Sequence, residues 1–175
     1  MEKNYKEIMP GITTFIFDVD GVLTDGSVTV FPNGELVRTM NTKDGYALKT
    51  AANLGYHICI ISGGTNPAVT MRLNGLGIDD IYLGAHEKTE PFKEYLEKNQ
   101  INPEEVMYMG DDLPDLPVMK LCGLPVCPKD AVPEVKEVSN YVSHKKGGKG
   151  CVRDVVEQVL KVQDKWNTNF DAKYD

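Results

Sequence analysis

The sequence predicts an α/β protein: a Rossmann-like three-layer sandwich with a mainly parallel central sheet, a small β-hairpin flap and no large cap domain. Short apolar segments alternate with segments of helical pattern along nearly the whole chain. Repeated alternation of strand and helix is typical of a parallel sheet. Polar residues follow the first four predicted strands. Ligands of such sheets bind beyond the carboxyl ends of the strands, so this is where we expect the functional site.

The predicted elements follow one another in a regular order. In the first half, strand and helix alternate over residues 13–20, 45–55, 57–62, 67–77, 80–84 and 88–99. In the second half, the alternation continues over residues 105–111, 113–123, 124–128, 132–138, 140–143 and 151–166. In the helix expected at 67–77, an apolar stripe of Val69, Leu73 and Leu76 faces the sheet and leaves Arg72 on one flank.

One segment, residues 27–40, departs from this alternation. It reads "SVTVF", a "PNG" turn and "ELVRTMN", which predicts a β-hairpin flap. A flap of this size cannot roof an active site alone. We therefore expect the substrate or another subunit to exclude water.

Bulk composition predicts one domain over residues 1–175, with a frayed tail at 166–175. A net charge of -7 argues against nucleic acid as the principal partner and leaves a small anionic substrate open. No apolar run approaches the roughly 20 residues that span a bilayer. The amino terminus is acidic and polar, so we expect a cytoplasmic protein without a membrane partner. The four cysteines lack C-x-x-C spacing and are expected to be reduced.

The stretch "TTFIFDVDGVLTDG" places two carboxylates at the end of the first strand. Asp18 and Asp20 are two residues apart, so a strand would project them from the same face. Two neighbouring carboxylates repel each other, and a simple turn needs only one acid. The pair therefore indicates a bound cation or a proton-transfer role.

Polar groups also follow the next three strands: Ser62, Lys88, and the group Asp111, Asp112 and Asp115. Each has a structural explanation, since Ser62, Asp111 or Asp112 could cap a helix and Lys88 could be a solvated lysine. However, the ends of parallel strands converge, and a lysine at a helix amino terminus opposes the macrodipole unless a negative charge is near. Several aspartates around an oxygen-rich opening favour Mg²⁺ over Ca²⁺.

This set of residues suits phosphoryl transfer. One aspartate, Asp18, can attack phosphorus and form an aspartyl-phosphate. The second, Asp20, can protonate the leaving oxygen and then activate water. Ser62 and Lys88 can hold the remaining phosphoryl oxygens. Gly21 lets the chain turn sharply beside the metal.

The motifs "DVDGVLTDG", "ISGG", Lys88 and "GDDLPD" resemble the four motifs of the haloacid dehalogenase superfamily of phosphohydrolases. Over residues 10–162, "NTKDGYALK", "RLNGLGI" and "GGKGCVRDVVE" resemble its capless sugar-acid phosphatases, above all those that hydrolyse 3-deoxy-D-manno-octulosonate 8-phosphate (KDO 8-phosphate). The resemblance implies a Mg²⁺-dependent cytoplasmic homotetramer of lipopolysaccharide precursor synthesis, that is, a phosphoric monoester hydrolase. It also implies these metal ligands: Asp18, Asp111 and the backbone carbonyl of Asp20, with Asp112 and Asp115 in support.

The chain departs from the family at one position. Many members read T-G-R after the second strand, whereas this chain has Ser62, Gly63 and Gly64. A cation that would touch phosphate or sugar is therefore missing, although Gly63 stays a candidate for substrate binding. The departure leaves the nine-carbon substrates KDN 9-phosphate and N-acylneuraminate 9-phosphate as alternatives.

Four further cations are candidates for binding the substrate. Arg72 matches an arginine of the family and could grip the carboxylate of a sugar acid in a two-point fork. Lys43, Lys149 and Arg153 are the next candidates. Lys149 lies in "KKGGKG", residues 145–150, which is either a solvated turn or a mobile loop that reaches a neighbouring active site; the resemblance favours the loop.

Two other functions remain open. The chain could be a non-catalytic assembly module that partners a nucleotide-sugar synthetase, because a fold does not guarantee turnover. It could also be a receiver-like domain that holds phosphate as a signal. The complete set Asp18, Asp20, Lys88 and Asp111 favours the enzyme over the module, and Asp20 argues against the receiver because it would speed hydrolysis.

Overall fold

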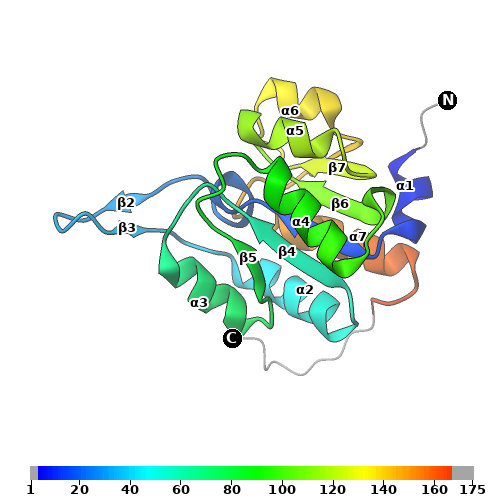
Figure 1. The fold of residues 1–175 in the computed structure, drawn as a ribbon, viewed down its shortest axis with the longest axis horizontal. Helices are drawn as coiled ribbons and strands as arrows, with labels where there is room; N and C mark the ends of the chain where they lie inside the picture. The colour runs from blue at the N-terminus through cyan, green and yellow to red at the C-terminus, as the bar shows by residue number, and fades with distance from the viewer. Residues whose placement is uncertain (1–3, 167–175) are drawn as a thin grey trace.

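The centre of the molecule is a six-stranded sheet in which all strands are parallel, in the order β5-β4-β1-β6-β7-β8. The computed structural model describes residues 4–166, so the expected tail lies outside the described residues except for Trp166, which packs against the core. The strands are β1 Thr14–Phe17, β4 His57–Ile61, β5 Asp80–Tyr82, β6 Val106–Met109, β7 Leu124–Cys127 and β8 Tyr141–Val142. The predicted fold class is confirmed, and Figure 1 shows the arrangement.

Helices cover both faces of this sheet and form the two outer layers (Figure 1). One face packs against α1 Tyr5–Ile8, α2 Thr42–Asn53, α3 Pro67–Gly75 and α7 Cys151–Val162. The other packs against α4 Thr89–Asn99, α5 Leu116–Met119 and α6 Pro133–Val138. Strand β1 shows why: Phe15 and Phe17 point to the first core, Ile16 points to the second, and all are fully buried.

The expected helices agree with the structure except at residues 113–123. There the chain forms a 3-10 turn, Leu113–Asp115, and then the short helix α5. Pro114 and Pro117 each lack a backbone N–H, so no continuous helix can form across them. Further 3-10 turns span Met9–Gly11 and Pro103–Glu105. On α3, the stripe of Val69, Leu73 and Leu76 is buried as expected, and Arg72 is half-buried.

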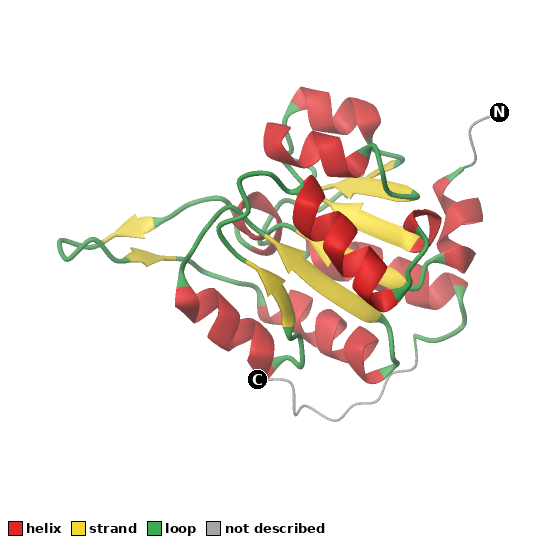
Figure 2. Cartoon of the chain, viewed as in Figure 1, coloured by secondary structure: helices red, strands yellow, loops and turns green. Residues whose placement is uncertain are grey.

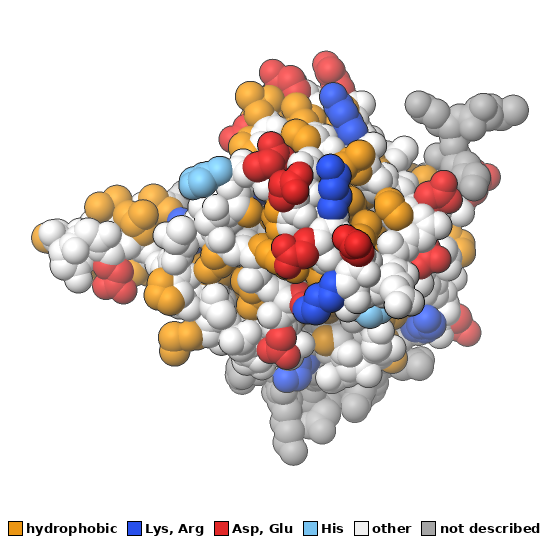
Figure 3. All heavy atoms as spheres, viewed as in Figure 1, with side chains coloured by type: hydrophobic (Ala, Val, Ile, Leu, Met, Phe, Trp, Pro, Cys, Tyr) orange, Lys and Arg blue, Asp and Glu red, His pale blue; other side chains and the backbone are white. Residues whose placement is uncertain are grey.

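Strands β2 Thr29–Val30 and β3 Leu36–Val37 form the predicted antiparallel hairpin, which projects from the body of the molecule (Figure 2). Its apolar side chains are exposed: Val28 by 41%, Val30 by 68% and Phe31 by 46%. Hydrophobic side chains are visible along this projection in Figure 3. The flap therefore offers apolar surface that the chain itself does not cover.

The glycine-lysine segment, 145–150, packs against the turn after β1. Gly147 and Gly148 are buried, and the N–H of Gly148 donates to Val22 O at 2.9 Å. A Cβ atom at Gly147 would lie 1.9 Å from the carbonyl oxygen of Gly21. The two glycines are thus packed against this turn, while the lysine side chains of the segment are exposed.

Among the described residues, none of the helices combines the length and the apolar character that a membrane span requires.

Candidate active site

Four loops at the carboxyl ends of β1, β4, β5 and β6 meet around a cavity of about 310 Å³. All of the catalytic and metal-binding candidates line it, together with residues that were not predicted. The lining residues are Asp18, Asp20, Ser62, Gly63, Gly64, Ala85, His86, Lys88, Asp111, Asp112, Pro114 and Asp115. The structure therefore brings together residues that lie nearly a hundred positions apart in the sequence, as the convergence of parallel strands requires.

The turn after β1 determines the positions of Asp18 and Asp20, the two aspartates of the motif "DVDGVLTDG". Asp18 has extended backbone angles, and an irregular turn, Val19–Leu23, follows it, in which Asp20 and Gly21 have non-helical backbone angles. Within this turn Gly21 has φ +93°, and a Cβ atom there would lie 1.9 Å from an oxygen of Asp111. Any side chain at position 21 would therefore collide with Asp111 as well as strain the backbone. The glycine thus brings the loops after β1 and β6 into contact.

Lys88 is the only lysine of the cavity and is buried, with 5% of its surface exposed. Its Nζ lies 2.9 Å from Asp18 Oδ1 and 2.7 Å from Asp115 Oδ1. Burial lowers the pKa of Lys88, but the two carboxylates more than offset burial and raise it. These carboxylates supply the negative charge that was expected near Lys88, because a lysine at the start of α4 opposes the helix macrodipole.

Asp115 holds this lysine and the loop after β6 in place. Its Oδ1 also accepts from the hydroxyl of Tyr108 at 2.7 Å. Its Oδ2 accepts from the backbone N–H groups of Asp111, at 3.0 Å, and Asp112, at 3.3 Å. With all of these bonds made, Asp115 supports the site by positioning Lys88 and the backbone of Asp111.

The carboxylates of the cavity outnumber the cations that could balance them. Carboxylate oxygens of Asp18, Asp111 and Asp115 lie within 4.8 Å of one another. Burial and then the charge of Asp115 raise the pKa of Asp18 to about 6. Burial and then the charges of Asp18 and Asp115 raise the pKa of Asp111 to about 8. Asp111 Oδ1 is buried and has no hydrogen-bond partner among the described residues. Such a set of oxygens fits a hard divalent cation such as Mg²⁺.

Two other candidates, Ser62 and Asp112, accept hydrogen bonds from backbone N–H groups of their own loops. Ser62 is buried, and its Oγ accepts from the backbone N–H of Gly64 at 3.3 Å. Asp112 is exposed and accepts from the N–H of Leu113 at 2.8 Å, so it caps the 3-10 turn. The oxygen of Asp112 is not among those that converge with Asp18 and Asp111.

Sequence reasoning missed Arg38, which follows the return strand of the flap. Its Nε and Nη2 donate to the two carboxylate oxygens of Asp20, at 2.7 and 2.9 Å. A Cβ atom at Gly64 would lie 3.4 Å from Arg38 Nη2, so the guanidinium lies beside the position where the family motif has an arginine. The only feature of the sequence that could have pointed to Arg38 is its positive charge in the flap, which directly follows the segment of Asp18 and Asp20. His86 was also missed; it is exposed at the cavity edge.

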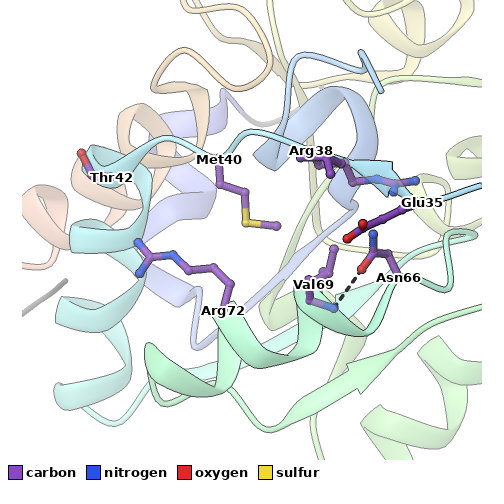
Figure 4. Close-up of a pocket in the computed structure, with 9 residues that line it drawn as sticks. Glu35, Arg38, Met40, Thr42, Asn66, Val69 and Arg72 are labelled. Atoms are coloured by element: carbon purple, nitrogen blue, oxygen red, sulfur yellow. Dashed lines mark hydrogen bonds between the residues drawn. The ribbon is translucent and has the colours of Figure 1, made fainter. Parts of the chain in front are cut away.

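The four cations predicted as candidates for substrate binding lie outside this cavity. Arg72 lines a separate cavity of about 400 Å³ between the flap and α3, where it extends toward α2 (Figure 4). Arg38 also lines this separate cavity, and its partner Asp20 lines the cavity at the strand ends. Lys43 and Lys149 line a third hollow, along α7, of about 580 Å³. Arg153, in the same hollow, stacks on Tyr46 and Trp166 and pairs with Glu157 at 3.0 Å.

Comparison with known proteins shows the family of the chain. A family model described as haloacid dehalogenase-like hydrolase matches residues 68–153. The 3-deoxy-D-manno-octulosonate 8-phosphate phosphatase of Salmonella typhi is 42% identical over 154 residues, which cover 88% of this chain and 82% of the relative. The phosphatase of the same name from Escherichia coli K12 is 41% identical over the same length and coverage.

Solved structures of the same kind superpose closely. The phosphatase of that name from Yersinia pestis has a TM-score of 0.91 at 36% identity, covering 94% of this chain and 89% of that one. The Moraxella catarrhalis enzyme, solved with magnesium, phosphate and KDO, has a TM-score of 0.90 at 31% identity, covering 93% of each chain. The chain therefore belongs to the haloacid dehalogenase-like hydrolases, and its relatives within that family are 3-deoxy-D-manno-octulosonate 8-phosphate phosphatases.

Proposed function

We propose that the protein is a Mg²⁺-dependent phosphomonoesterase that hydrolyses KDO 8-phosphate to KDO and phosphate. The observation that carries the proposal is the buried Lys88, which lies 2.9 Å from Asp18 in a cavity that Asp20, Ser62 and Asp111 also line. A buried cation beside a buried carboxylate suits binding and transfer of a phosphoryl group. The substrate follows from the relatives, which are named for this activity.

In the first half of the reaction, an Asp18 oxygen attacks phosphorus and the bond to the sugar oxygen breaks. The leaving oxygen takes a proton from Asp20. Lys88 and the hydroxyl of Ser62 hold phosphoryl oxygens while the charge moves. The products of this half are an aspartyl-phosphate on Asp18 and the free sugar acid.

In the second half, Asp20 removes a proton from water as the water oxygen attacks phosphorus. The bond to Asp18 breaks, so the carboxylate is restored and inorganic phosphate leaves. Mg²⁺ would be held by Asp18, Asp111 and the backbone carbonyl of Asp20, and would offset the negative charge of the phosphoryl group. Asp115 and Asp112 contribute by ordering the loop that carries Asp111.

We place the sugar-acid carboxylate near Arg72, in its own or a neighbouring subunit. Within residues 4–166 no carboxylate forms an ion pair with Arg72, and the residue is half-buried. Lys43 and Lys149 stay secondary candidates, since they reach the substrate only if a neighbouring subunit brings their hollow to its cavity.

We also propose that the protein is a homotetramer of the cytoplasm that acts in lipopolysaccharide precursor synthesis. The exposed apolar flap supports self-association. The four free cysteines are typical of a reducing compartment. The assembly-module function is less well supported, because such a module has no need for the buried Lys88–Asp18 pair.

The test is a phosphate-release assay on KDO 8-phosphate, KDN 9-phosphate and N-acylneuraminate 9-phosphate, with Mg²⁺ and with EDTA. We expect the highest kcat/KM on KDO 8-phosphate and loss of turnover in EDTA. A preference for a nine-carbon substrate would change the assignment within the family. Absence of Mg²⁺-dependent turnover on all three, with a folded protein, would favour the assembly module.

A further inference from the structure

Tyr108, on β6, is a buried tyrosine that contacts the candidate active site from the core. Its side chain is fully buried between the sheet and helices α4, α5 and α6, whereas its neighbours Met107 and Met109 face the other core. Its hydroxyl donates to Asp115 Oδ1 at 2.7 Å. Tyr108 itself does not line the active-site cavity, so it can act on the site only through Asp115.

Distance alone would admit Asp115 as a metal ligand. One carboxylate oxygen of each of Asp18, Asp111 and Asp115 lies within 4.8 Å of the other two. An ionised carboxylate has about four lone-pair positions, two on each oxygen, and a metal ion needs one that is free. Whether Asp115 can bind the ion therefore depends on how many of its positions are already used.

Four donors use the lone pairs of Asp115. Its Oδ1 accepts from Lys88 Nζ at 2.7 Å and from the Tyr108 hydroxyl at 2.7 Å. Its Oδ2 accepts from the backbone N–H groups of Asp111, at 3.0 Å, and Asp112, at 3.3 Å. Three of these donors belong to residues that line the cavity, and the fourth is the hydroxyl from the core. Tyr108 thus occupies the one position that the cavity residues leave open.

We propose that Tyr108 is a positioning residue that keeps Asp115 out of the metal's coordination and thereby sets the preference for Mg²⁺. The protein then offers the ion only Asp18, Asp111 and the carbonyl of Asp20. Few protein ligands with several waters suit Mg²⁺, whereas Ca²⁺ takes about six to eight oxygen ligands in a flexible arrangement. A free oxygen on Asp115 would add a protein ligand and favour the larger ion. This proposal rests on the proposed Mg²⁺-dependent phosphatase function.

Isothermal titration calorimetry of the metal-free protein with MgCl₂ and with CaCl₂ measures this preference. Loss of a group that supports metal ligands typically changes metal affinity or activity by about 10- to 100-fold. We expect the ratio of the Kd for Ca²⁺ to the Kd for Mg²⁺ to be about tenfold lower in Tyr108→Phe than in wild type. With Mg²⁺, kcat on KDO 8-phosphate should also fall about tenfold, because Asp115 would hold Lys88 less firmly.

Tyr95→Phe is the matched control. Tyr95 is fully buried in the same core, and its hydroxyl has no hydrogen-bond partner among the described residues. This variant removes a buried hydroxyl without freeing a carboxylate oxygen, so its ratio of Kd values should equal that of wild type. In a protein that already carries Asp115→Asn, Tyr108→Phe should leave the ratio unchanged, because the effect of Tyr108 passes through that carboxylate.

A crystal structure of the wild type with bound Mg²⁺ adds a measurement that does not depend on any variant. We expect both Asp115 oxygens to lie beyond the ligand distance of about 2.1 Å, with the bond from Tyr108 intact. An Asp115 oxygen bound to the ion beside an intact Tyr108 bond would overturn the proposal.

The calorimetric outcomes separate this proposal from the proposed function. An unchanged ratio in Tyr108→Phe, an equal fall in Tyr95→Phe, or a fall that persists in the Asp115→Asn background would overturn the role of Tyr108 and leave the phosphatase intact. A wild-type protein that binds neither ion and releases no phosphate would overturn both.

Discussion

Asp18 lies in a cluster whose negative charges are only partly balanced. Lys88 lies between Asp18 and Asp115, while Asp111 adds a third carboxylate within reach of the other two. Burial and the charge of Asp115 raise the pKa of Asp18 to about 6, and that of Asp111 is raised to about 8. The same features that destabilise these carboxylates favour a divalent cation and a phosphoryl group, because both need fixed charges in a site with little water.

Asp18→Asn tests the nucleophile. We expect phosphate release to fall by several orders of magnitude, because an amide cannot form the phosphoenzyme. The protein should remain folded by circular dichroism, since Lys88 keeps its bonds to Asp115. Asp25→Asn is the control, an exposed carboxylate in the same segment. Activity above a hundredth of wild type in Asp18→Asn contradicts the assignment.

Arg72→Ala tests the carboxylate site. A charge-assisted contact is worth roughly 1.5–3 kcal/mol, so kcat/KM on KDO 8-phosphate should fall about ten- to a hundredfold. The loss on p-nitrophenyl phosphate, which has no carboxylate, should be much smaller. Met71→Ala, an exposed neighbour on the same helix, should behave as wild type. Equal losses on both substrates would instead mean that Arg72 supports the fold or the assembly.

At the scale of elements, the glycine-lysine segment packs against the turn after β1 that carries Asp18 and Asp20. Gly147 lies against Gly21, and its N–H donates to Asp130 Oδ1 at 2.9 Å. Gly148 lies against Thr24 and Asp25. The position of Asp18 and Asp20 therefore depends on a segment more than a hundred residues away.

Gly147→Ala measures this dependence. The added methyl group would lie 1.9 Å from the Gly21 carbonyl oxygen, so either segment must move. Overpacking of this kind costs about 1–3 kcal/mol, and a shifted turn would misplace Asp18, the proposed nucleophile. We expect a melting temperature several degrees lower and at least tenfold slower phosphate release. Lys146→Ala, an exposed side chain of the same segment, should change neither. An unchanged melting temperature in Gly147→Ala would show that the segment gives way freely.

A second element-scale contact makes stability depend on pH. Asp44, at the start of α2, is 1% exposed and accepts the N–H of Arg153 at 2.8 Å, which joins α2 to α7. Burial raises its pKa from 3.8 to about 6, despite the N–H groups at the start of α7. The folded state therefore binds the proton more tightly than the unfolded state, so the stabilisation is complete below pH 4 and is lost as pH rises to 6.

Asp44→Asn should remove this dependence. The amide oxygen can still accept from Arg153 but does not titrate in this range. One pKa unit corresponds to about 1.4 kcal/mol, so between pH 4 and pH 7 the variant should gain at most roughly 3 kcal/mol on wild type. Urea unfolding at several pH values with constant Mg²⁺ measures the difference. A constant difference in unfolding free energy across that range would contradict the raised pKa.

At the scale of the whole molecule, the flap bears on whether one subunit alone can exclude water from the active-site cavity. Its apolar side chains are exposed, and its two strands have 2 residues each, so we expect that the flap alone does not close the cavity. Self-association would cover this surface and exclude water from the site.

Val30→Asp combined with Phe31→Asp tests the assembly. We expect wild type to sediment as a tetramer and the double variant to shift to smaller species, because charge on the flap opposes burial of its apolar surface. Activity on KDO 8-phosphate should fall with the assembly. Asn33→Asp is the control, since it adds charge at the flap turn without removing apolar surface. A wild-type protein that is monomeric and fully active at micromolar concentration would refute the tetramer.

The sequence by itself determined which segments form the sheet and the helical layers, and at which edge of the sheet the candidate site lies. Strand and helix periodicity is local, so β1, β4 and β6 could be read from runs of apolar residues, and their polar ends identified Asp18, Ser62 and Asp111. Lys88 was also predicted from a local pattern, because a positive charge at the start of a helix is unfavourable unless a negative charge lies nearby. Periodicity failed only where two prolines divide the helix expected at 113–123.

Only the tertiary structure decided how side chains from different loops meet. Arg38 reaches Asp20 through the fold of the flap, and Gly147 meets Gly21 through the path of the chain after β8. Asp115 faces Lys88 because a 3-10 turn directs it inward, and Arg72 lines a separate cavity because α3 turns it toward α2. Spacing along a chain sets which face of its own element a side chain occupies, whereas contacts between loops depend on backbone turns and side-chain torsions that no local pattern records.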